Sequence, residues 1–190
     1  VAGGKNDAFP DGMRHFWRLD SRLANKANWE RLPDLPSNVF STVLAAQHDG
    51  YGLCIFQYSG KSASKYSTAV YVYPIHERSS PAWSEKAPMP HATLAATAVG
   101  KDDYEVLVFG GSDGHNIANR LALKDDYHLS KSIIKYDAVN DAWCPIGDMP
   151  IGIVSTTAVW WNGLLVLPGG ELGNAMRTNK VLALKIGDAK

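Results

Sequence analysis

The chain has few cysteines, no surplus of charge and no long apolar run. Among its 190 residues are only two cysteines, Cys54 and Cys144, which are too few for a disulfide framework and are both expected to be small buried apolar residues. Nineteen basic and nineteen acidic residues cancel and are scattered, so the sequence predicts no nucleic-acid partner and no membrane partner. No apolar run approaches the roughly 20 residues of a membrane span, and no signal peptide is visible.

What the sequence does have is an internal repeat. Three segments, WERLPDLP, WSEKAPMP and WCPIGDMP, begin at Trp29, Trp83 and Trp143, and each places a proline seven residues after its tryptophan. Two short apolar runs that end in a glycine pair or a Ser-Gly, followed by a third apolar run, recur along the chain. The last glycines of these pairs are Gly4, Gly60, Gly111 and Gly170, which lie 56, 51 and 59 residues apart.

These repeats predict the four-stranded blades of a kelch-type β-propeller. A period near 50 residues, four short strands, a glycine pair after the second strand and a later tryptophan are typical of that fold. We therefore expect an all-β protein with about four blades, two complete and two partial, of a six-bladed ring. The single propeller region 1–190 divides into units of about 1–36, 37–90, 91–150 and 151–190. We expect this region to be incomplete, with further propeller blades outside this chain.

Turn residues and tryptophans have structural roles in this prediction. Asp49-Gly50 and Asn162-Gly163 lie where a tight hairpin turn needs positive φ angles. The three repeated tryptophans are large enough to fill the space between neighbouring blades, and we expect them to do so.

The topology of an antiparallel blade sorts its loops onto two faces. Loops that follow the glycine pairs share one face with the links between blades, and side chains there converge on the mouth of the central channel. Glu171 follows its glycine pair directly, and Arg177 returns toward the third strand after a six-residue excursion, so the two side chains can face one another. On position alone, a solvated ion pair that contributes little is the favoured interpretation.

Three segments also resemble one family. GGELGNAMRTNKVLALKI, GGSDGHNIAN and FWRLDSRLANKANWERLPDLP are similar to sequences of the N-acetylneuraminate epimerases, also called sialate or cyclically permuted mutarotases, which form six-bladed kelch propellers. The Gly-Glu and Arg-Thr motif of that family matches Gly170, Glu171, Arg177 and Thr178. Between them, this chain has LGNAM in place of the family's usual turn, which contains Lys-Pro-Gly. The resemblance covers about the first four of six blades and favours a periplasmic or secreted protein.

The resemblance implies a sugar mutarotase, an isomerase that interconverts the anomers of N-acetylneuraminic acid (sialic acid) or a related acid sugar. It transfers catalytic roles to Glu171, as general acid/base, and to Arg177, as partner of the substrate carboxylate. Asn116, His115 and Thr178 are the expected substrate-binding residues. Ring opening by proton transfer requires no cofactor and no metal, so neither is expected.

Two other classes of function fit a kelch propeller. A non-catalytic module that binds carbohydrate or a protein partner is compatible with the neutral charge and the varied loops, and it predicts binding without turnover. A copper radical oxidase would need a Cys–Tyr crosslink with further His and Tyr ligands, but both cysteines fall in expected strands. The histidines show no metal-ligand spacing, which argues against a metal hydrolase; they are His15, His48, His76, His91, His115 and His128.

Overall fold

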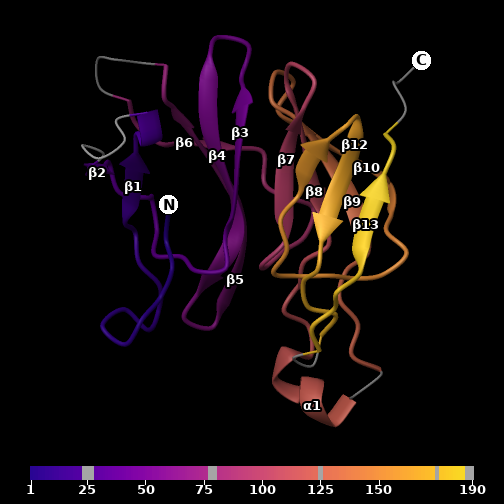
Figure 1. Ribbon diagram of the computed structural model, residues 1–190. Helices are drawn as coiled ribbons and strands as arrows, with labels where there is room; N and C mark the ends of the chain where they lie inside the picture. The colour runs from indigo at the N-terminus through magenta and orange to yellow at the C-terminus, as the bar shows by residue number, and fades with distance from the viewer. Residues whose placement is uncertain (23–27, 77–80, 124–125, 174–175, 187–190) are drawn as a thin grey trace.

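The computed structural model describes residues 1–22, 28–76, 81–123, 126–173 and 176–186 (Figure 1). Within these ranges the chain is almost entirely β, with antiparallel strands in four separate sheets that follow one another in chain order. The expected all-β, propeller-like architecture is confirmed. A short 3-10 helix, η2 (Ile117–Asn119), runs into the short helix α1 (Arg120–Leu123), and no described helix is long and apolar enough to cross a membrane.

Two sheets are complete four-stranded blades and the outer two are smaller, as the repeats predict. The first sheet pairs β1 (Phe16–Leu19) with β2 (Trp29–Leu32). The second contains β3 (Val43–His48), β4 (Leu53–Ser62), β5 (Lys65–Pro74) and β6 (Ser84–Lys86). The third contains β7 (Thr97–Lys101), β8 (Glu105–Phe109), β9 (Ser132–Asp137) and β10 (Ala142–Asp148). The fourth contains β11 (Val159–Trp161), β12 (Leu164–Pro168) and β13 (Val181–Leu184).

The two predicted hairpin turns differ in structure. Asn162 and Gly163 both have positive φ, 48° and 75°, as a two-residue turn of type I′ requires. Between β3 and β4 only Gly50 has positive φ, and four residues, 49–52, connect the strands. The Asp49 carboxylate closes this longer loop, because its Oδ1 accepts the backbone N–H groups of Tyr51 and Gly52 at 2.9 and 3.0 Å.

Aromatic side chains fill the space between the second and third sheets. Phe56 and Tyr58 on β4 and Tyr136 on β9 are fully buried, and Trp143 on β10 packs on Tyr58 and Tyr136 with ring centroids 5.6 and 4.9 Å apart. The Trp143 indole N–H also donates to the Ala87 carbonyl of the second sheet at 3.0 Å. The expected inter-blade role of this tryptophan is therefore confirmed.

The other two repeated tryptophans differ from each other. Trp83 packs on Phe16 of the first sheet and Tyr73 of the second, with centroids 5.2 and 5.3 Å away, and its N–H donates to the Pro33 carbonyl. It therefore fills an inter-blade space as expected. Trp29 is 54% exposed on β2, so for this residue the prediction is wrong. Trp29 lines an apolar hollow together with Leu44 and Ile55 of the second sheet, so it borders the space between these blades without filling it.

Polar groups also join the second and third sheets at one end. Gln47 on β3 is buried, and its side-chain amide donates to the backbone carbonyls of Lys101 and Glu105 on the third sheet, at 3.2 and 2.8 Å. Nearby, the Glu105 carboxylate pairs with Lys101 at 3.0 Å and with Lys135. The Gln47 bonds therefore join the two complete blades, whereas the Glu105 ion pairs link three neighbouring strands within the third blade.

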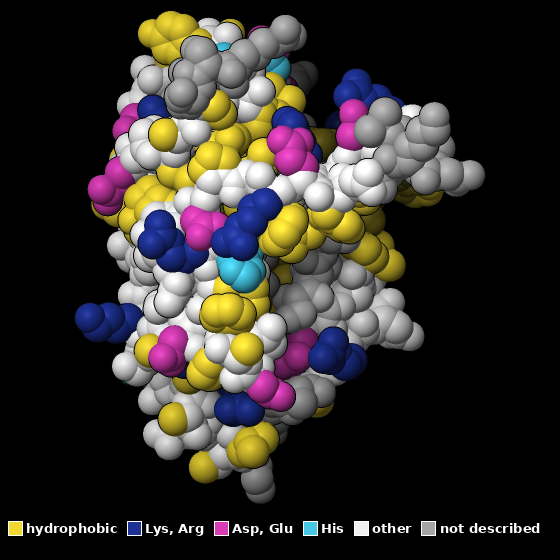
Figure 2. Space-filling model, turned by 90° about the vertical axis from the view of Figure 1, so that its left-hand side faces the viewer, with side chains coloured by type: hydrophobic (Ala, Val, Ile, Leu, Met, Phe, Trp, Pro, Cys, Tyr) yellow, Lys and Arg dark blue, Asp and Glu magenta, His cyan; other side chains and the backbone are white. Residues whose placement is uncertain are grey.

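Large apolar side chains remain exposed on the outer sheets. The first sheet exposes Leu19 and Trp29, and the fourth exposes Trp161 and Val181, each by 41% or more. Figure 2 views the molecule from the side of the first sheet, where hydrophobic side chains are interspersed with charged ones. Further blades packed on these sheets remain a prediction.

Candidate functional site

The residue after each glycine pair occupies an equivalent backbone position in successive blades. Three of these residues form isolated β-bridges with the links that enter their blades: Lys61 with Phe40, Ser112 with Leu94, and Glu171 with Val154. Lys5 is the corresponding residue after the first glycine pair. In Figure 1 these loops lie toward the end of the sheets that carries α1. The repeat therefore brings four side chains of different chemistry, Lys5, Lys61, Ser112 and Glu171, to one end of the arc.

All four side chains line one cavity of about 340 Å³. The cavity is also lined by Phe40 and by two residues from the long loop of the third blade, Arg120 and Tyr127. Because its lining comes from all four sheets or the loops attached to them, it lies where the central channel of a propeller is expected. This is the candidate functional site.

Two lysines give one side of the cavity a positive charge. The Nζ atoms of Lys5 and Lys61 lie 4.6 and 5.9 Å from the centre of the Phe40 ring, so both ammonium groups lie near the same aromatic ring. Lys61 Nζ is also 4.9 Å from the centre of the Tyr66 ring. Cation–π contacts of this kind hold an ammonium in place and leave its N–H groups able to bind an anion. Neither lysine was predicted from the sequence, although Lys5 follows a glycine pair and Lys61 follows the corresponding Ser-Gly, which is the same position that selected Glu171.

Glu171 lies in the cavity with its backbone fixed on both sides. Its N–H and carbonyl exchange hydrogen bonds with Val154 at 2.9 and 3.0 Å, and its strand segment also bridges Arg177. Its Oε2 lies 3.6 Å from Nε of Arg177, so the two side chains face one another as predicted. The Glu171 side chain is 25% exposed and the Arg177 side chain is 75% exposed. At this distance and exposure the pair itself adds little stability, and the arginine is free to turn toward a ligand.

The three predicted substrate-binding residues, unlike Glu171, are not among the described residues that line the cavity. The Thr178 N–H donates to the Gly170 carbonyl and its hydroxyl accepts the Lys180 N–H, so it fixes the backbone beside Glu171. His115 and Asn116 are exposed on the long loop of the third blade. Arg177 is not among the described residues that line the cavity either; Arg120, four residues after Asn116, does line it.

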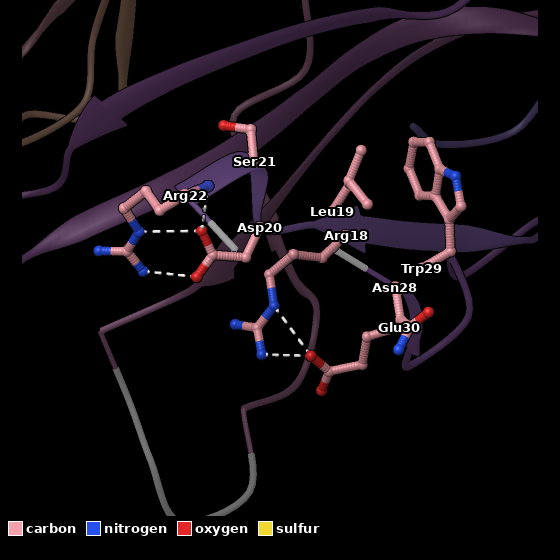
Figure 3. Close-up of a pocket in the computed structure, with 8 residues that line it drawn as sticks. All are labelled: Arg18, Leu19, Asp20, Ser21, Arg22, Asn28, Trp29 and Glu30. Atoms are coloured by element: carbon pink, nitrogen blue, oxygen red, sulfur yellow. Dashed lines mark hydrogen bonds and ion pairs between the residues drawn. The ribbon is translucent and has the colours of Figure 1, made fainter. Parts of the chain in front are cut away.

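A larger hollow of about 660 Å³ lies at the end of the first sheet (Figure 3). Its charged side chains are neutralised in pairs: Arg18 contacts Glu30 at 2.5 Å, and Arg22 contacts Asp20 at 2.7 Å. Two hydrogen bonds from the Arg22 side chain and one from its backbone N–H lower the pKa of Asp20 to about 2. Because these groups are paired with one another on the surface, we place the candidate site in the smaller central cavity.

Comparison with known proteins supports the fold and leaves the activity open. No protein-family model and no curated protein sequence matches the chain. A solved structure described as "Structure of YjhT" superimposes with a TM-score of 0.72 over 94% of this chain at 16% sequence identity. The present chain spans 51% of that chain, about half its length. At this identity the likeness establishes a shared kelch-type fold.

Proposed function

We propose that this protein acts as a mutarotase on N-acetylneuraminic acid or a related acid sugar, with Glu171 as its acid/base group. The observation that carries the proposal is that Glu171 lines one cavity with the cations of Lys5, Lys61 and Arg120. A positively charged cavity attracts an anionic sugar, and a carboxylate within it can exchange protons with a sugar hydroxyl. The Gly-Glu and Arg-Thr motif, which is similar to that of the sialate mutarotases, supports the same chemistry.

In the proposed reaction the Glu171 carboxylate accepts the proton of the anomeric hydroxyl. The bond between the anomeric carbon and the ring oxygen breaks, the hydroxyl oxygen becomes a carbonyl oxygen, and the former ring oxygen takes up the proton from Glu171. Rotation about one carbon–carbon bond then presents the other face of the carbonyl, and the reverse transfers close the ring. Glu171 ends as a carboxylate, so each cycle conserves protons. Positioned acid/base groups of this kind contribute about 10²- to 10⁴-fold.

The position of the carboxylate on the sugar decides which cation holds it. In N-acetylneuraminic acid the carboxylate is bonded to the anomeric carbon, so it must lie close to the acid/base group. Arg177, 3.6 Å from Glu171, is then its partner, and its planar guanidinium suits bidentate binding. In a hexuronic acid the carboxylate is carried by the carbon on the other side of the ring oxygen and not by the anomeric carbon, so it can lie farther from Glu171, toward Lys5 and Lys61 on the first and second blades. We propose the first arrangement, with the lysines bound to hydroxyl or amide oxygens.

Anomer exchange followed by NMR exchange spectroscopy tests the role of Glu171. We expect the protein to accelerate exchange between the two anomers of N-acetylneuraminic acid, and Glu171→Gln to lower that rate about 100-fold or more. Glu85→Gln, at an exposed position on β6, is the matched control and should leave the rate unchanged. Equal rates for the Glu171→Gln variant and the parent protein would refute the assignment.

The same assay separates the two ligand classes and the non-catalytic alternative. Arg177→Gln should raise KM for N-acetylneuraminic acid more than Lys61→Gln does, whereas the opposite order with glucuronic acid would indicate that a uronic acid is the substrate. Line broadening of the sugar signals without faster exchange would instead favour a kelch module that binds sugar without turnover.

A further inference from the structure

Three residues with metal-ligating side chains meet at the end of the second sheet that lies opposite the cavity. Asp49 begins the loop between β3 and β4, Cys54 is the second residue of β4, and His76 follows β5. Cys54 and Lys61 lie at opposite ends of β4, roughly 20 Å apart at the usual rise of a strand. The cluster is thus separate from the cavity and independent of the proposed mutarotase activity.

The ligand atoms are close enough to share one ion. One side-chain oxygen of Asp49, the sulfur of Cys54 and one ring nitrogen of His76 all lie within 4.8 Å of one another. Cys54 Sγ is 3.9 Å from His76 Nδ1. Around a tetrahedral zinc ion, a sulfur and a nitrogen ligand are about 3.6 Å apart, given the usual bond lengths. Small side-chain rotations would therefore bring the three atoms to coordination distance.

The surrounding backbone is arranged to bring the three groups together. A Cβ atom on residue 52 would lie 2.3 Å from Cγ of His76, so only glycine at this position lets the imidazole approach the thiol. Asp49 Oδ1 accepts the two backbone N–H groups of the loop, which fixes the carboxylate in the way that outer-shell hydrogen bonds orient metal ligands. Its second oxygen, Oδ2, takes no part in these two bonds and can coordinate.

We propose that Asp49, Cys54 and His76 form a binding site for a zinc-like divalent cation. Thiolate and imidazole ligands favour zinc over magnesium or calcium, which prefer oxygen ligands, and a water molecule would complete the tetrahedral set. His76 is exposed and Cys54 is buried, so the ion would lie at the surface with its sulfur ligand anchored in the core. It would tie the β3–β4 loop to the end of β5 and release the thiol proton on binding.

Cobalt(II) titration of the purified protein tests the site, because a cobalt–thiolate bond has a charge-transfer absorption in the near ultraviolet. We expect one equivalent of cobalt(II) to produce this band, with the strong visible absorption of tetrahedral cobalt, and zinc(II) to displace it. Cys54→Ser should abolish the charge-transfer band. Cys144→Ser, at the other cysteine, which is exposed, is the matched control and should leave the band unchanged.

Two further variants keep the test valid if loss of the buried thiol disturbs folding. His76→Gln changes an exposed side chain, and Asp49→Asn keeps an oxygen that can accept the two loop N–H groups. Each should weaken cobalt binding by at least the roughly 10- to 100-fold that loss of an outer-shell partner costs. The proposal is overturned if the folded parent protein gives no charge-transfer band, or if its affinity for cobalt is the same in the His76→Gln and Asp49→Asn variants.

Discussion

Asp141, in the turn between β9 and β10, accepts one hydrogen bond from its own blade and one from the second blade. Its Oδ1 accepts the Tyr136 hydroxyl at 2.6 Å and the backbone N–H of Ala87, beside β6, at 2.8 Å. Asp141→Ala would remove the acceptor of both donors, and Tyr136 is fully buried. Each unpaired buried group costs about 1–3 kcal/mol, so we expect the free energy of unfolding to fall by about 2–4 kcal/mol.

Asp141→Asn is the matched control. Asparagine keeps a side-chain oxygen in the same place and tolerates the positive φ of 51° at this position, which alanine does not. Burial and the hydrogen bond to Asp141 both raise the pKa of Tyr136, so its hydroxyl remains a neutral donor to the amide oxygen at ordinary pH. We expect this variant to lose about 1 kcal/mol or less, because only the charge assistance of the hydrogen bonds is removed.

Urea unfolding followed by tryptophan fluorescence measures both variants. Trp143 packs on Tyr136 and donates to the Ala87 carbonyl, so its emission reports on this contact. The midpoint should fall with little change in the slope, since the surface exposed on unfolding is the same. If Asp141→Ala loses less than about 0.5 kcal/mol, or Asp141→Asn loses as much as Asp141→Ala, the two hydrogen bonds to Asp141 do not stabilise the contact between the blades.

Two further predictions concern backbone packing and pH. Gly110 and Gly163 both have positive φ, 64° and 75°, but a Cβ on Gly110 would lie 2.4 Å from the Ile153 carbonyl oxygen, whereas one on Gly163 would meet nothing within 4 Å. Gly163→Ala should therefore cost about 1–2 kcal/mol from backbone strain alone, and Gly110→Ala at least about 2 kcal/mol more; equal losses in urea unfolding would contradict this. Burial raises the pKa of Glu105, but hydrogen bonds from Lys135 and Lys101 lower it by more, so the pKa lies below its ordinary value of 4.5. Its stabilising effect is present at neutral pH and lost as the pH falls through that lowered pKa. Glu105→Gln should therefore cost about 1 kcal/mol at pH 7 and progressively less as the pH is lowered below 4.5, and a cost that does not vary with pH would exclude this role.

Features of the sequence that reflect blade packing predicted the fold well. The glycine pairs and the Trp-to-Pro spacing recur because each blade meets its neighbours in the same way, so the number of blades and their order could be inferred. The prediction that Trp29 fills an inter-blade space was wrong because the repeat shows where a residue lies in its blade but not what packs against that blade. The prediction of a tight turn between β3 and β4 was wrong because Asp49-Gly50 also fits a longer loop, in which the aspartate side chain accepts the hydrogen bonds that close the loop.

The clustering of Asp49, Cys54 and His76 could not be read from spacing in the sequence. The gaps between them, 5 and 22 residues, match no metal-binding signature, which is why the sequence predicts no metal site. Strand register brings them together: Cys54 pairs with Pro74 in the β4–β5 ladder, two residues before His76, and the β3–β4 hairpin returns the chain past Asp49. Ligands that come from three strand ends are adjacent only after the sheet has formed.

The cavity shows how one repeated position can provide different chemistry around a channel. Lys5, Ser112 and Glu171 follow glycine pairs and Lys61 follows the corresponding Ser-Gly, so the repeat presents the four residues in the same way and only their side chains differ. The charge therefore changes from positive on the first two blades, through neutral on the third, to negative on the fourth. In the proposed arrangement the sugar places its anomeric centre and carboxylate beside Glu171 and Arg177, and its hydroxyl or amide oxygens beside the two lysines, which orients it. Glu171 and the lysines thus line one cavity, because the repeat that places the glutamate also places the two lysines.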